Sequence, residues 1–158
     1  DGDLTYLQQD RLTAFKTYIS RVKDAGIKTT IISMAGDRLT LRMVVYVDGT
    51  IYTADGELIS EPTKPVETAV KTYLTQLPFN GELVLEHLTD YLQTVSGVEV
   101  PHITQATCAA VSATGQTESG YAAAEVIDVR HTPESGYFVV SFDTADDWHS
   151  TIEYRFKP

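Results

Sequence analysis

The stretch from Pro65 to Gly97 constrains the fold most, because it holds two amphipathic helices joined by a tight turn. Proline suits the first turn of a helix, so the first of the two is expected to begin near Pro65. Its apolar stripe recurs at helical spacing and comprises Val66, Ala69, Val70, Tyr73, Leu74 and Leu77. After the Pro-Phe-Asn-Gly turn, the second helix is expected to end at Gly97. Its apolar stripe comprises Leu85, Leu88, Leu92 and Val95. Helices of this kind predict a sheet for them to pack across.

Another helix and a set of strands are expected before this stretch. An N-terminal helix is indicated by Leu4, Leu7, Leu12, Phe15, Ile19 and Val22, with Gly26 as its stop. Residues 27–34 and 39–47 alternate with a period of two, which predicts two strands joined by a hairpin at 35–38. Asp48-Gly49 predicts a tight turn with a short return strand at 50–53.

The chain after the central helices is predicted to be mostly β. A short strand is expected at 82–85, and a long one at 98–111 with a bend or bulge at Pro101. Three more are expected at 125–130, 137–142 and 151–156. The order of elements predicts an α+β fold with mostly antiparallel sheets in two lobes and about three amphipathic helices. The lobes would be residues 1–80 and 81–158. Because no flexible linker separates them, one continuous domain is the alternative.

The charge of the chain is uneven. The 158 residues carry a net charge of −10: nine Lys/Arg against ten Asp/Glu in 1–80, and three against twelve in 81–158. Phosphate backbones repel such a surface, which argues against nucleic-acid binding. No apolar run approaches the roughly 20 residues of a membrane helix. The acidic half either serves solubility or steers a basic partner to a surface formed by Glu118, Glu125, Asp128, Glu134, Asp143, Asp146 and Asp147.

The histidines and the single cysteine give no pattern of a catalytic or metal site. His87, His102, His131 and His149 are never spaced i, i+4, the spacing that places two imidazoles on one metal. His131 and Asp128 could form a pair in which the carboxylate orients the imidazole as a base, but the sequence indicates no nucleophile for such a pair. Cys108 is expected inside a strand as a buried, inert thiol, because reactive cysteines need an electropositive setting. With one cysteine, the chain cannot form an internal disulfide.

Ligand motifs are also missing from the sequence. The acidic run from Asp143 to His149 does not match the alternating ligands of an EF-hand loop and is read as a solvated hairpin tip. Neither a P-loop nor a dinucleotide-binding glycine motif occurs. A nucleotidyltransferase would need two acidic residues on adjacent same-face strand positions, whereas Asp48, at a distance after Gly36, has no second acid two residues beyond it. We therefore expect no catalytic residue, no cofactor, no metal and no small-molecule substrate.

Several segments together resemble the C-terminal part of baseplate J-like proteins, structural subunits of contractile phage tails and tail-derived injection machines. The matching segments are 16–27, 39–49, 65–83, 88–103, 131–140 and 152–156, with the Leu-Pro-Phe-Asn-Gly turn at 77–81 and the Val-Ser-Gly-Val step at 95–98 as the strongest pieces. The resemblance implies a non-enzymatic virion or prophage structural protein. Its partners would be other baseplate or tail proteins, or further copies of itself in a ring, assembled in the bacterial cytoplasm.

Two other functions stay open. A secreted or surface protein-binding module fits the nine tyrosines and a chain that starts at Asp1, which we read as processed or truncated. An enzyme of the nucleotidyltransferase type is the other, although its metal-binding acidic pair is not found.

Overall fold

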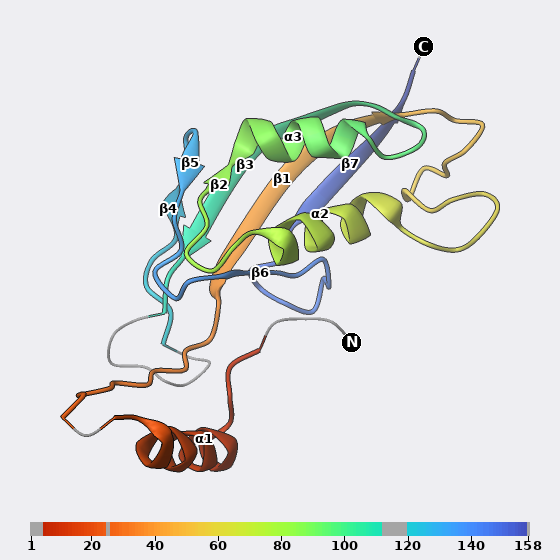
Figure 1. The fold of residues 1–158 in the computed structure, drawn as a ribbon. Helices are drawn as coiled ribbons and strands as arrows, with labels where there is room; N and C mark the ends of the chain where they lie inside the picture. The colour runs from red at the N-terminus through yellow and green to blue at the C-terminus, as the bar shows by residue number, and fades with distance from the viewer. Residues whose placement is uncertain (1–4, 25, 112–119, 158) are drawn as a thin grey trace.

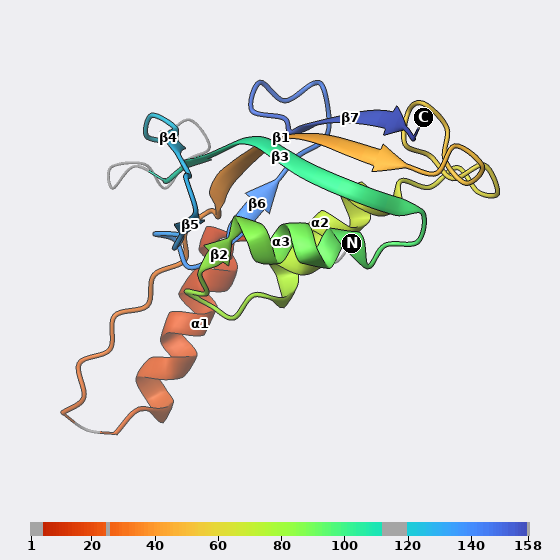
Figure 2. The same cartoon turned by 90° about the horizontal axis from the view of Figure 1, so that it is seen from above.

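Two helices cover one face of a five-stranded sheet, and a third helix lies apart from both (Figures 1 and 2). The computed structural model describes residues 5–24, 26–111 and 120–157. The helices are α1 (Gln9–Val22), α2 (Pro65–Gln76) and α3 (Leu85–Gln93). In the described part of the chain, none of them has both the length and the apolar character that a membrane span requires.

The central strand β1 (Asp37–Val47) organises the sheet. Its odd-numbered residues are all buried, while its even-numbered residues are half-buried or exposed, as the period of two predicts. The buried side chains face α2 and α3, whose own buried stripes meet them in one core. The α+β class is therefore confirmed, and so are the predicted positions of α2, α3 and β1.

Both edges of β1 are occupied. The long strand β3 (Val98–Ala109) pairs antiparallel along one edge, and β4 (Glu125–Val126) continues the sheet beyond it. Along the other edge β6 (Phe138–Val140) and β7 (Thr151–Phe156) both pair parallel to β1. A separate two-stranded sheet joins β2 (Leu83–Val84) to β5 (Arg130–His131). The main sheet thus takes strands from both halves of the chain, which favours the one-domain alternative.

Strands β6 and β7 form one interrupted edge with a loop inserted between them. The Ser150 N–H donates to the Ser141 carbonyl at 2.7 Å and closes the loop at its base. The buried Ser150 hydroxyl accepts a hydrogen bond from the Leu41 N–H at 2.9 Å. Leu41 lies between the parts of β1 that pair with β6 and β7, so this bond gives its N–H the partner that neither strand provides. The expectation that residues 143–149 form a hairpin tip was therefore wrong, because the strands on either side run in the same direction.

The expected strand at 27–34 was also wrong. Residues 27–36 are extended but belong to no sheet, and no hairpin joins them to β1. This segment lacks a sheet partner because β3, β6 and β7 already take both edges of β1.

Smaller corrections concern three other β segments. Residues 50–53 form a turn with one bridge between Tyr52 and Leu58. The strand expected at 125–130 is replaced by β4 at its start and the first residue of β5 at its end. The bend or bulge expected at Pro101 is found on either side of it and not at the proline itself. Register shifts lie opposite Arg42/Met43 and Tyr46/Val47, while Pro101 pairs with Val45. A strand of 12 residues tolerates proline here because bulges on either side absorb the irregularity.

The N-terminal helix stands away from the body on an arm, which we define as residues 5–24 and 26–36 (Figures 1 and 2). Within the described residues, α1 makes no extensive packing contact with the sheet or with α2 and α3. The arm is attached at its root. The Tyr137 hydroxyl donates to the Met34 carbonyl, and the Tyr121 hydroxyl donates to the Gly36 carbonyl, each at 3.0 Å.

Leu74 and Leu88 are buried, as the helical stripes predict, with 5% and 0% of their surfaces exposed. Replacing either with alanine removes buried carbon and leaves a cavity, so each change should lower the free energy of unfolding by roughly 2–5 kcal/mol. Ile59→Ala is the control, because Ile59 is 60% exposed. Chemical denaturation measures all three, and a loss below about 1 kcal/mol at Leu74 or Leu88 would contradict the packing described.

Gly56 makes room for the aromatic ring of Tyr154 on β7. It has a φ of +76°, and a methyl group there would lie 2.0 Å from Tyr154 Cζ. Gly56→Ala should therefore cost about 1–2 kcal/mol for the left-handed backbone and roughly 1–3 kcal/mol more for the overlap. Gly26→Ala is a matched control with φ +93° and open space around it. Equal losses for the two variants in thermal unfolding would show that the ring contact contributes nothing.

Candidate functional site

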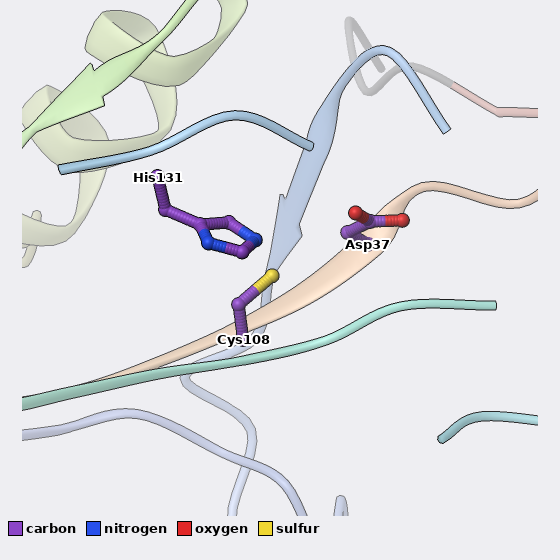
Figure 3. Close-up of side chains that lie close together, drawn as sticks. All are labelled: Asp37, Cys108 and His131. Carbon is purple, nitrogen blue, oxygen red and sulfur yellow. The ribbon is translucent and has the colours of Figure 1, made fainter. Parts of the chain in front are cut away.

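Three side chains with metal-binding or proton-transfer chemistry meet at one end of the main sheet (Figure 3). Asp37 opens β1, Cys108 lies near the end of β3, and His131 closes β5. One ligand atom of each lies within 4.8 Å of the other two. Because Cys108 pairs opposite Leu39, Cys108 and Asp37 are diagonal neighbours on the buried face of the sheet.

Asp37 is fully buried and holds the loop that precedes β6. Its carboxylate accepts the Glu134 N–H at 2.6 Å and the Ser135 N–H at 3.3 Å. Its own N–H donates to the Tyr137 carbonyl at 3.0 Å. These bonds give Asp37 a structural role, since a buried carboxylate must be compensated. A carboxylate has about four lone-pair sites, so two backbone donors leave it able to accept another ligand.

Cys108 is a buried thiol in an acidic setting. Burial, followed by the charges of Asp37, Glu125 and Glu134, raises the pKa of the thiol to about 12. Nucleophilic cysteines have lowered pKa values and lie near positive charge, so these surroundings oppose a thiolate nucleophile. The prediction of a buried cysteine within a strand is confirmed.

His131 is half-buried and reaches the cluster from the small sheet. It pairs with Leu83 of β2, and its ring lies 6.2 Å from the ring of Phe138, measured between centroids. Figure 3 shows the imidazole directed towards the Cys108 sulfur, with the Asp37 carboxylate beyond it. The expected partner of His131 was Asp128, but the structure brings it to Asp37 and Cys108 instead.

A cavity of about 270 Å³ lies beside the cluster, with Cys108, His131, Glu125 and Glu134 among its lining residues. Sulfur, imidazole nitrogen and carboxylate oxygen are together a donor set that suits zinc and related divalent cations. The expectation that no His, Cys or Asp residues would converge was therefore wrong at this position. Sequence spacing could not reveal the cluster, because its members are brought together by pairing between distant strands.

The other candidate residues do not join this cluster. His87 and His102 are exposed on α3 and β3, and His149 lies in the 141–150 loop with its Nδ1 2.6 Å from the Asp146 carbonyl oxygen. Asp48 and Gly36 lie at opposite ends of β1. The Asp48 carboxylate accepts the Thr50 N–H at 2.8 Å, which lowers the pKa of Asp48 and holds the turn in which it lies.

The acidic residues predicted as a partner surface fall into two groups. Glu125, Asp128 and Glu134 are exposed around β4 and β5, while Asp143 and Asp147 are exposed in the 141–150 loop at the opposite edge of the sheet. Asp146 is half-buried and accepts a hydrogen bond from the Ser141 hydroxyl, which makes it part of the loop's own structure. Glu118 lies outside the described residues.

Comparison with known proteins adds no relative. No protein-family model matches the chain, and neither the curated proteins nor the solved structures contain a match. The function is therefore inferred from the resemblance in the sequence and from the geometry of the structure.

Cys108 should be almost unreactive in the folded, metal-free protein. A pKa of about 12 leaves so little thiolate at pH 8 that reaction with Ellman's reagent should be slower than in the unfolded chain by roughly 100-fold or more. The measurement is unambiguous because Cys108 is the only cysteine. The same sample in denaturant is the control. Equal rates in the folded and unfolded states would contradict the buried, acidic setting.

Proposed function

We propose that this chain is a structural subunit of a contractile-tail baseplate and acts through protein–protein assembly. The observation that carries the assembly part is the arm, an amphipathic helix and extended segment held away from the core. Its exposed apolar residues range from 37% exposure at Tyr6 to 67% at Ile32, with Leu7, Phe15, Tyr18, Val22 and Ile27 between them. Exposed apolar surface of this kind marks interaction sites in soluble proteins.

The charge of the arm supports the same proposal. It carries five Lys/Arg and two Asp/Glu, a net charge of +3, in a chain whose total is −10. A neighbour with an apolar groove and an acidic rim would complement it. The acidic residues near β4 and in the 141–150 loop would, in turn, suit a basic neighbour. A subunit with two surfaces of opposite charge can join two different neighbours, which is what a ring or layered particle requires.

The type of particle rests on the resemblance to baseplate J-like proteins. The segments that carry it include α2 and α3, whose apolar stripes belong to the core, and the turn between them. In this proposal the helices and sheet form a rigid body, and the arm and acidic edges make the contacts.

Co-purification with the proteins encoded beside this one tests the proposal. Paired Phe15→Ser and Tyr18→Ser changes on the arm should reduce recovery of the partner at least tenfold, because the apolar contact is lost. Ile59→Ser is the matched control, since Ile59 is also exposed but lies outside the arm. Asp143→Lys with Asp147→Lys, assayed at low and high salt, tests the acidic edge.

Each outcome has a distinct meaning. Loss of the partner with the arm variants alone supports assembly through the arm. Salt-dependent loss with the lysine variants supports the acidic edge. Neighbouring genes that encode no sheath, tube or wedge proteins, together with retained monomeric behaviour, would contradict the baseplate proposal and favour a separate protein-binding module.

A further inference from the structure

We propose that Asp37, Cys108 and His131 bind a single Zn²⁺ ion, with its fourth coordination position facing the cavity beside them. The proposal is independent of the assembly function. It departs from the sequence, which indicated no metal site, and it starts from the convergence of three strands on one point.

The distances fit a tetrahedral ion after a small adjustment. Zinc binds sulfur at about 2.3 Å and imidazole nitrogen or carboxylate oxygen at about 2.0–2.2 Å, so neighbouring donors lie about 3.4–3.7 Å apart. The three donor atoms already lie within 4.8 Å of one another. His131 is the half-buried member, on a strand of two residues, and its ring can supply most of the remaining movement.

The residues around the three ligands supply orienting hydrogen bonds and a suitable balance of charge. The Asp37 carboxylate is oriented by the N–H groups of Glu134 and Ser135, the outer hydrogen bonds that hold metal-binding carboxylates in place. None of the salt bridges found among the described residues includes Asp37. Zn²⁺ with one thiolate and one carboxylate is neutral, and a neutral group is the form that burial favours.

The fourth position and the choice of metal depend on the cavity and the donors. The cavity is lined by Cys108, His131 and Glu134, so a water molecule in the cavity can complete the coordination while the site stays neutral. Sulfur and imidazole favour zinc over magnesium or calcium, which prefer oxygen alone. Binding would join β1, β3 and β5 and so tie the small sheet to the main one.

Cobalt and zinc titrations of the tag-free, metal-free chain test the site. Co²⁺ should give intense visible bands of a tetrahedral ion and a thiolate-to-cobalt charge-transfer band, and one equivalent of Zn²⁺ should displace it. Zn²⁺ should raise the unfolding temperature saturably, while Mg²⁺ should not. The spectrum of the unaltered chain already decides whether the thiol is a ligand, even where a variant fails to fold.

Variants then identify the ligands. Cys108→Ser and His131→Ala should each weaken Zn²⁺ binding by roughly 100-fold or more, since even outer hydrogen-bonding partners contribute 10–100-fold. His102→Ala is the matched control, because His102 is exposed on β3 away from the cluster, and it should bind as the unaltered chain does. Circular dichroism confirms that each variant is folded. A cobalt spectrum without thiolate bands, or Zn²⁺ binding that survives both Cys108→Ser and His131→Ala, would overturn the proposal.

Discussion

The rest of the structure depends on β1, which is paired along both edges and covered by helices on one face. Its buried face carries Leu39, Leu41, Met43, Val45 and Val47, and α2 and α3 cover them. Its two edges are taken by β3 and by the β6–β7 pair.

The arm is a consequence of this constraint. Residues 27–34 have the alternating β-branched sequence of a strand, but no edge of β1 is free to accept them. The segment therefore remains extended outside the sheet, and α1 is carried away from the core with it. An extended segment and a helix with exposed apolar residues would be a liability in an isolated molecule. They are useful in a subunit whose neighbours supply the missing contacts.

Local pattern predicted those parts of the fold that depend on a single element. The stripes of α2 and α3, the alternation of β1 and the bounds of β7 were all evident from spacing alone. What depends on pairing between elements was not predictable. A parallel edge made by β6 and β7 with Ser150 between them has no local signature, because its hydrogen bonds go to a strand about 100 residues earlier, with Leu41 and Ser150 separated by 109 positions.

The cluster of Asp37, Cys108 and His131 was hidden for the same reason. Each residue alone looks ordinary: an acid after a glycine, a cysteine among small residues, and a histidine before Thr-Pro. Register places Cys108 opposite Leu39, and the small sheet brings His131 over them. A sequence search for metal ligands relies on short spacings within one element. Three ligands from three strands leave no such spacing to find.

The cluster and the root of the arm meet at one loop, which links the two proposals physically. Residues 134 and 135 donate to the Asp37 carboxylate, and Tyr137 of the same loop binds both the Asp37 N–H and the Met34 carbonyl. Gly36 lies between these contacts, and a methyl group there would come within 2.6 Å of the Tyr137 ring. The direction of the arm is therefore set by the loop that Asp37 holds. A cation on Asp37 would reinforce that loop through the same carboxylate, and the position of the arm would become firmer without any direct contact between the ion and α1.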